Sequence, residues 1–150
     1  MKKILYIVIW QLAIVQSFAQ VARKRAIPPS YFTESIAQTV MTTWKDSFFL
    51  GNQARWSYDM GVILKGFEGI WRNTGDVKYY NYLLKQMNFF VQDDGTIKTY
   101  RPDEYNIDHI NNGKLVLLLY RITQKEKYLK AAKLLREQLR THPRTKEGGF

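Results

Sequence analysis

The chain has 150 residues, with 23 Lys and Arg against 13 Asp and Glu and no cysteine. The lack of cysteine excludes disulfides, thiolate metal sites, a cysteine nucleophile and a lipoprotein anchor. The net charge of +10 favours anionic partners such as nucleic acid, anionic lipid or an acidic sugar, although basic residues scattered through helical patterns also suit a solvated surface. His109 and His142 are too far apart for a local metal motif, so we expect no metal and no cofactor.

Residues 1–19 have the pattern of a secretory signal peptide. "MKK" precedes an apolar run of about a dozen residues, and residues 17–19 form a small-x-small cleavage site. The run is too short for a comfortable membrane span. The basic residues 23–25 follow closely, and positive charge there favours an uncleaved anchor instead. We expect an exported protein, periplasmic or secreted, without stable membrane insertion and with residues 20–29 as a linker.

Apolar residues at helical spacing predict an all-α chain with five helices. The first begins with Ser30 as its cap, and the second is ended by Gly75. Asp76 caps the third. The turn signal Asp94-Gly95 then predicts a small β-hairpin. The expected helices run from Ser30 to about Trp44, Ser57 to Thr74, Asp76 to Phe90, His109 to Ile122 and Glu126 to Arg140.

The sequence repeats itself at a shift of 49 positions. The shift places Asp59 on Asp108, Trp71 on Tyr120, Arg72 on Arg121, Thr74 on Thr123, Lys78 on Lys127 and Tyr79 on Tyr128. Each unit reads as a helical hairpin, and hairpins at this period build a solenoid or a closed ring that needs at least about three copies. The chain holds about two and a half units, so we expect a truncated structure with an apolar edge that further hairpins or an oligomer cover.

The aligned aspartates have two interpretations. An aspartate at the start of a helix caps free N–H groups and complements the helix dipole, which is the structural interpretation of Asp59 and Asp108. Asp108 has different neighbours, because Asn106, His109 and the amides at 111 and 112 surround it with hydrogen-bonding groups and no bulky apolar cover. Such surroundings are typical of a cavity mouth, where a carboxylate does chemistry.

Three strings of the chain resemble one enzyme family. They are "RWSYDMGVILKGFEGIWRNTGDVKYY", "DDGTIKTYRPDEYNIDHINNGKLVLLLYRITQKEKYLKAA" and "LREQLRTHPRTKEGGF". In this order they resemble the unsaturated rhamnogalacturonyl hydrolases, glycoside hydrolase family 105, with the related family 88 glucuronyl hydrolases. "EYNIDHINNGK" and "HPRTKEGGF" are the most specific. The resemblance covers about residues 30–150, which it marks as the N-terminal part of a glycosidase domain.

The resemblance implies an (α/α)6 barrel, of which this chain forms the first part, with the small β-hairpin as an insertion. It also implies removal of a terminal unsaturated uronic acid from pectin oligosaccharides by hydration of the C4=C5 double bond. That chemistry needs two carboxylates, one to donate a proton and one to orient the sugar and perturb its partner. Asp108 matches the partner. The usual proton donor belongs to a "W-x-D-G"-like stretch beyond residue 150, so we expect this chain alone to be inactive.

The resemblance also suggests substrate contacts. Trp56 and Tyr58 align with the aromatic approach to the cavity, while core packing is the other interpretation of Tyr58. Asn106 and His109 adjoin Asp108 as candidate contacts, although such a histidine more often supports a site than catalyses. Arg144 either faces sugar or holds its own loop.

Two other classes of function compete with the glycosidase. A helical-repeat binding or scaffold module needs neither Asp108 nor a sugar, because stacked hairpins host many functions. A basic nucleic-acid binder is disfavoured by the predicted export and by the absence of a nucleic-acid motif, so we expect an acidic oligosaccharide as the ligand and no nucleic acid.

Overall fold

The computed structural model describes residues 29–50 and 53–149. The predicted leader and nearly all of the predicted linker lie outside the described residues. The chain divides into two compact units, Met1–Ile36 and Ala37–Phe150. In the first unit, the described residues belong to the start of helix α2 (Pro29–Thr43). Pro29 is already helical, so the prediction that Ser30 caps this helix is wrong. Proline suits the first turn of a helix because a backbone N–H at that position would have no acceptor within the helix.

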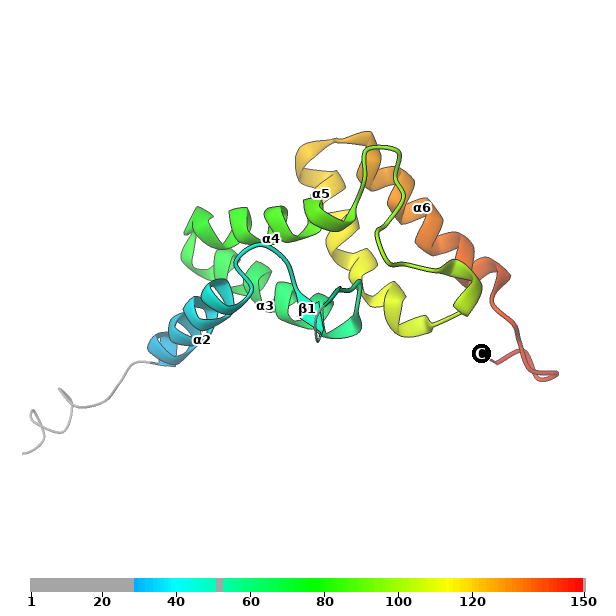
Figure 1. Cartoon of the computed structure of the whole chain (residues 1–150), viewed down its shortest axis with the longest axis horizontal. Helices are drawn as coiled ribbons and strands as arrows, with labels where there is room; N and C mark the ends of the chain where they lie inside the picture. Colours follow the sequence, from blue (N-terminus) through cyan, green and yellow to red (C-terminus); the bar gives the residue numbers. More distant parts are fainter. Residues whose placement is uncertain (1–28, 51–52, 150) are drawn as a thin grey trace, which may run out of the picture. The chain divides into compact units, whose positions relative to one another are not determined.

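The second unit is built mainly from two helical hairpins (Figure 1). After the end of α2, its elements are β1 (Phe49–Leu50), β2 (Gln53–Ala54), α3 (Tyr58–Thr74), α4 (Val77–Phe90), the 3-10 helices η1 (Pro102–Glu104) and η2 (Ile107–Asn112), α5 (Gly113–Thr123) and α6 (Glu126–Thr141). The two short strands pair antiparallel and were not predicted. The helices confirm the all-α prediction. The helix expected from His109 starts instead as the 3-10 helix η2, and α5 begins at Gly113.

The helical hairpins keep the 49-residue register in their backbone. The shift places the first residue of α3 on that of η2, the end of α3 on the end of α5, and the start of α4 on the start of α6. The η2–α5 pair is therefore the counterpart of α3, and this confirms the predicted correspondence of the two units.

Both helical corners use the same hydrogen bonds. The hydroxyl of Thr74 donates to the Ile70 carbonyl at 2.8 Å, and that of Thr123 donates to the Leu119 carbonyl at 2.7 Å. The residue after each threonine, Gly75 or Gln124, has a positive φ of 71° or 54°. A left-handed residue at this point ends the helix and turns the chain back. The repeated threonine is thus a corner residue with a defined bond.

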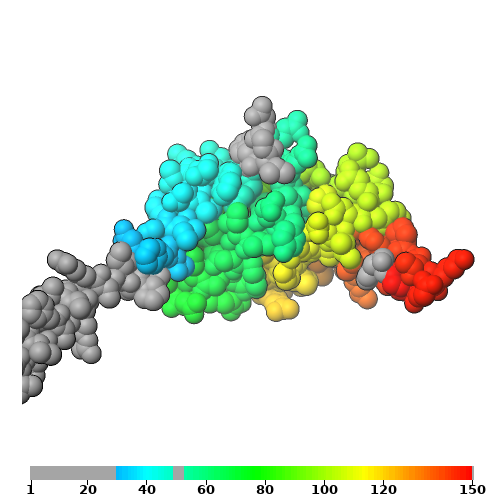
Figure 2. Space-filling model, turned by 90° about the horizontal axis from the view of Figure 1, so that it is seen from below, coloured from blue at the N-terminus to red at the C-terminus, as the bar shows by residue number. Residues whose placement is uncertain are grey.

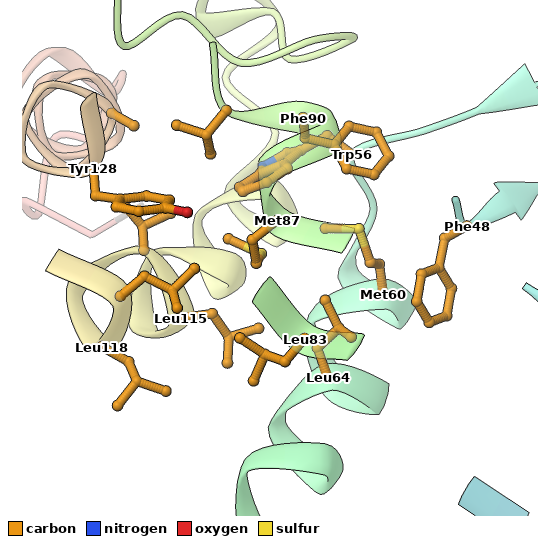
Figure 3. Packing of buried hydrophobic residues seen from close by; sticks show 14 of the residues in the cluster. Phe48, Trp56, Met60, Leu64, Leu83, Met87, Phe90, Leu115, Leu118 and Tyr128 are labelled. Carbon is orange, nitrogen blue, oxygen red and sulfur yellow. The ribbon is translucent and has the colours of Figure 1, made fainter. Parts of the chain in front are cut away.

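The core lies between the helical hairpins (Figure 3). Leu64, Leu83 and Met87 of the first hairpin are fully buried, together with Leu115 and Leu119 of the second. Each such side chain contributes about 1.5–3 kcal/mol of burial free energy. The second helical hairpin therefore covers an apolar face of the first.

The equivalent face of the second hairpin carries an open apolar groove. The groove has a volume of about 480 Å³ and lies along α5 and α6; its lining residues are Ile110, Gly113, Lys114, Leu117, Leu129, Ala132, Lys133, Leu135, Arg136 and Leu139. The 49-residue shift places Gly113, Ala132 and Leu139 on the buried Leu64, Leu83 and Phe90. The groove thus corresponds to a surface that is buried on the first hairpin.

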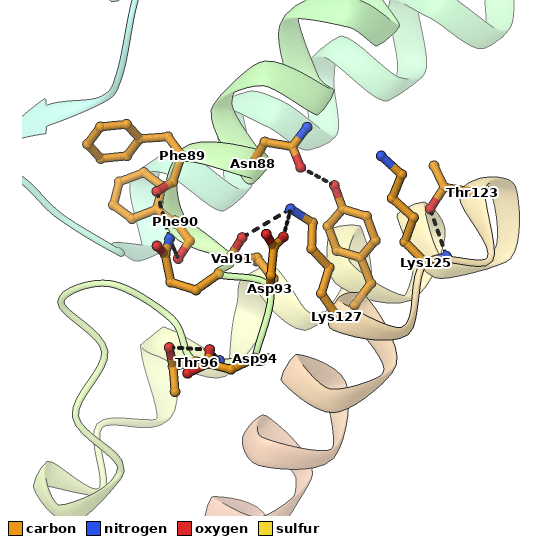
Figure 4. Close-up of polar contacts among 12 residues, drawn as sticks. Asn88, Phe89, Phe90, Val91, Asp93, Asp94, Thr96, Thr123, Lys125 and Lys127 are labelled. Atoms are coloured by element: carbon orange, nitrogen blue, oxygen red, sulfur yellow. Dashed lines mark hydrogen bonds and ion pairs between the residues drawn. The ribbon is translucent and has the colours of Figure 1, made fainter.

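The predicted β-hairpin at Asp94-Gly95 is reduced to one bridge. Val91 pairs with Ile97, and the N–H of Gln92 donates to the Thr96 carbonyl at 2.9 Å. Asp94 closes the turn by accepting from both the N–H and the hydroxyl of Thr96 (Figure 4). The arms stay short because Val91 is the C-cap of α4 and a new turn follows Ile97.

Gly95 packs this turn against α6. Its φ is 91°, and a Cβ atom there would lie 2.3 Å from Cβ of Lys130. Both the backbone conformation and the lack of space require glycine. Gly66, inside α3, has no such neighbour within 4 Å.

We expect Gly95→Ala and Gly66→Ala to have opposite effects on the free energy of unfolding. Gly95→Ala should lower it by about 1–3 kcal/mol, because both strain and a clash are introduced. Gly66→Ala should raise it by about 0.5–1 kcal/mol, because alanine loses less backbone entropy in a helix. Urea denaturation followed by circular dichroism measures both. Equal effects from the two variants would contradict the packing of the turn on α6.

Candidate functional site

The segment between the two helical hairpins presents the candidate carboxylate. Figure 2 shows residues of this segment, in yellow-green and yellow, at the molecular surface. Pro102 opens η1, as proline does in a first turn, and Arg101 pairs with Asp103 at 3.0 Å. Tyr105 has a positive φ of 49°, after which Asn106 leads into η2. Every residue from 101 to 108 is exposed.

Asn106, and not Asp108, caps η2. Its Oδ1 accepts a hydrogen bond from the N–H of Asp108 at 3.0 Å. In α3 the equivalent position is Ser57, whose hydroxyl accepts from the N–H of Met60 at 3.4 Å. The capping interpretation of Asp59 and Asp108 is therefore wrong. A capping side chain must precede the first helical residue, whereas both aspartates are the second residue of their helices.

The carboxylate of Asp108 is exposed. Among the described residues, no side-chain hydrogen bond or ion pair holds it. It also lines neither of the two cavities described in this structure. As the second residue of η2, it lies near the helix start, where negative charge is favoured. Its position thus leaves the carboxylate available to a ligand.

The ring of His109 lies beside the cap. Nδ2 of Asn106 is 3.4 Å from Nε2 of His109, and the ring meets Tyr100 edge to face with centroids 6.2 Å apart. Nδ1 is buried without a hydrogen-bond partner among the described residues.

A buried polar chain fixes the backbone of Asn106. The hydroxyl of Tyr100 donates to Oε1 of Gln138 at 2.6 Å, and Nε2 of Gln138 donates to the Asn106 carbonyl at 3.1 Å. Burial raises the pKa of Tyr100 to about 12, which keeps its hydroxyl a donor. Neither Tyr100 nor Gln138 was predicted from the sequence to support the site. The signal was a glutamine at position 138 on the face of α6 that also buries Ala131 and Leu135.

Trp56 is a core residue in this structure. Its side chain is 1% exposed and packs edge-on against Phe90, as Figure 3 shows. Its Nε1 donates to the His109 carbonyl at 2.9 Å, and its backbone N–H donates to Oγ1 of Thr99 at 2.8 Å. The expectation of direct substrate contact is thus wrong for this covered side chain. Trp56 instead holds η2 against the start of α3.

A second bond joins the same two segments. Nδ2 of the buried Asn112 donates to the Ser57 carbonyl at 3.0 Å. Gly61 makes the close approach possible, since a Cβ atom there would lie 1.7 Å from Oδ1 of Asn112. The segment with Asp108 is therefore bound to α3 through side chains far apart in the sequence.

The remaining candidates divide between surface and loop. Tyr58, the first residue of α3, is 49% exposed, so its side chain is accessible to a ligand. Arg144 donates to the Gly148 carbonyl at 3.2 Å, which is a loop-holding contact. Within residues 29–50 and 53–149, no group of three or more His, Cys, Asp or Glu side chains is arranged for a metal ion. The helices of this part are all too short or too polar to cross a membrane.

Together, the fold and the site define an all-α hairpin-repeat protein with a free carboxylate at the start of a repeated helix. A family model described as Glycosyl Hydrolase Family 88 matches residues 32–150. The chain belongs to this family.

A solved structure supports the same assignment. The chain is similar to a family 105 glycoside hydrolase from C. acetobutylicum ATCC 824, with 40% identity and a TM-score of 0.68. The match covers 77% of this chain and 31% of that one, so this chain spans about a third of its relative's length. The helices are thus part of an (α/α)6 barrel fold, as the sequence predicts.

We expect Asn106→Ala and Asp108→Ala to separate the cap from the free carboxylate. Asn106→Ala should lower the free energy of unfolding by about 1 kcal/mol, because the first turn of η2 loses its acceptor. Asp108→Ala should change it by less than about 0.5 kcal/mol, as at an ordinary surface position. The measurement is urea denaturation of the full chain. A larger loss for Asp108→Ala would give its carboxylate a structural role.

Proposed function

We propose that this chain forms the first part of a glycosidase that removes terminal unsaturated uronic acid from rhamnogalacturonan oligosaccharides of pectin. The reaction is hydration of the C4=C5 double bond. A proton adds to C4, water adds to C5, and the resulting hemiketal opens and expels the neighbouring sugar. Membership of a glycosyl hydrolase family supports a carbohydrate substrate. An acidic substrate also suits the net charge of +10.

The free carboxylate of Asp108 carries the proposal. A carboxylate engaged in capping has fewer acceptor sites left for sugar hydroxyl groups, and the cap on Asn106 leaves both oxygens of Asp108 for a ligand. In the proposed reaction Asp108 orients the sugar and raises the pKa of the proton-donating carboxylic acid by its negative charge. That acid comes from another part of the complete enzyme. The chain alone is therefore expected to be inactive.

Some neighbours of Asp108 contact the substrate directly in this proposal, and Trp56 acts indirectly. Tyr58 offers its exposed ring and hydroxyl to the substrate. Asn106 and His109 keep their assignment as substrate contacts, and their side chains lie together, with Nδ2 of Asn106 3.4 Å from Nε2 of His109. Trp56 acts through the backbone of His109 rather than by touching the sugar. We further propose that residues 1–19 direct export, where pectin fragments are met.

A chimera tests the proposal. Residues 32–150 replace the matching segment of the C. acetobutylicum glycoside hydrolase, and activity is followed by the loss of ultraviolet absorbance of an unsaturated uronyl oligosaccharide. We expect the chimera to turn over this substrate. Asp108→Asn in the chimera should lower kcat/KM about 10²- to 10⁴-fold without lowering Tm, because a positioned carboxylate is lost.

Asp103→Asn is the matched control, since it changes an exposed carboxylate of the same segment that pairs only with Arg101 among the described residues. Its kcat/KM should equal that of the parent chimera. Full activity in Asp108→Asn would remove Asp108 from the reaction. A folded chimera that leaves the unsaturated uronate unchanged would refute the proposed substrate.

A further inference from the structure

A second cavity lies beside the start of α3, and Asp108 is not among its lining residues. It has a volume of about 220 Å³, and its lining residues are Trp44, Phe48, Arg55, Ser57, Asp59, Met60 and Ile63. Pockets for drug-sized ligands occupy about 300–1,000 Å³, so this cavity is of a size for a single ring. Asp59 is the counterpart of Asp108 under the 49-residue shift.

Part of the cavity lining is apolar. Phe48 is 5% exposed and Met60 is fully buried, while the half-buried Trp44 stacks on Phe48 with ring centroids 4.9 Å apart and planes 25° apart. The stacking holds the indole in a fixed orientation. Such a wall suits the C–H face of a pyranose, which is apolar.

Two of the lining residues are charged, one a cation and one an anion. Arg55 and Asp59 are both exposed, and among the described residues neither side chain is held by an ion pair or a hydrogen bond. A guanidinium only donates hydrogen bonds and a carboxylate only accepts them. A neutral ligand with hydroxyl groups satisfies both. A charged ring would be attracted by one of these two groups and repelled by the other, whereas a neutral sugar meets no like-charge repulsion.

The cavity is structurally joined to the segment that carries Asp108. Ser57 lines the cavity, and its carbonyl accepts the hydrogen bond from Asn112 of η2 at 3.0 Å. Its neighbour Trp56 bonds the His109 carbonyl at 2.9 Å. Asp59 and Asp108, which are equivalent under the 49-residue shift, thus lie in two segments that these two hydrogen bonds join.

We propose that the cavity formed by Trp44, Arg55 and Asp59 is a sugar subsite that takes one neutral pyranose unit of the oligosaccharide substrate. The pyranose stacks its apolar face on Trp44 and shares its hydroxyl groups between Arg55 and Asp59. This assignment rests on the proposed function, because it takes the ligand to be part of a saccharide. It adds to that function a site for an uncharged sugar, distinct from the one assigned to the uronate.

The test is a titration of the full 150-residue chain with methyl α-L-rhamnopyranoside, followed by the indole N–H resonances in NMR spectra. Trp44→Phe assigns the Trp44 signal. We expect this signal to shift with a dissociation constant of about millimolar size, as for other weak single-ring ligands, while the signal of Trp71 stays in place. Arg55→Gln and Asp59→Asn should each weaken binding at least fivefold, and Asp103→Asn should leave it unchanged.

Three outcomes would overturn the subsite. The Trp44 signal stays fixed in the unmodified chain, both charged variants bind as tightly as the parent, or the anionic methyl α-D-galactopyranosiduronate binds more tightly than the neutral sugar. The first and third outcomes do not depend on the folding of any variant. The chimera assay reports separately on the proposed function. An active chimera with a fixed Trp44 signal refutes only the subsite, whereas a shifted signal with an inactive chimera refutes only the proposed reaction.

Discussion

The contact between η2 and the start of α3 is the constraint on which the rest of the structure depends. Two hydrogen bonds, from Trp56 to the His109 carbonyl and from Asn112 to the Ser57 carbonyl, cross between segments more than 50 residues apart. Both donors are buried, so a broken bond leaves a polar group without water, which costs about 1–3 kcal/mol. Gly61 supplies the space. This contact sets the register between the two helical hairpins and so positions Asp108.

The different roles of Asn106 and Asp108 follow from helix geometry. Asn106 precedes η2 and satisfies a backbone N–H, and the chain from Tyr100 through Gln138 holds its carbonyl. Asp108 lies inside the helix, where its side chain cannot reach that N–H. The amide of Asn106 therefore caps the helix, and the carboxylate of Asp108 stays exposed. Such an arrangement leaves the Asp108 carboxylate free to bind and release a ligand.

The repeat explains both the closed and the open surfaces of the second unit. In the first helical hairpin, Leu64, Leu83 and Phe90 are fully buried. In the second, the equivalent positions border a groove, and the residues there are smaller or more polar, such as Gly113 and Ala132. The backbones of the two hairpins correspond, but their surface residues differ.

Sequence alone determined the helices, the 49-residue register and the corner residues, because helix periodicity and left-handed turns are local properties of the chain. It also singled out Asp108 and its polar neighbours. Only the tertiary structure decided that Asn106 is the cap, that Trp56 is buried, and that Gln138 supports the site. These facts depend on which distant segments meet, and a side chain's hydrogen-bond partner or burial across such a contact is not written in its local pattern.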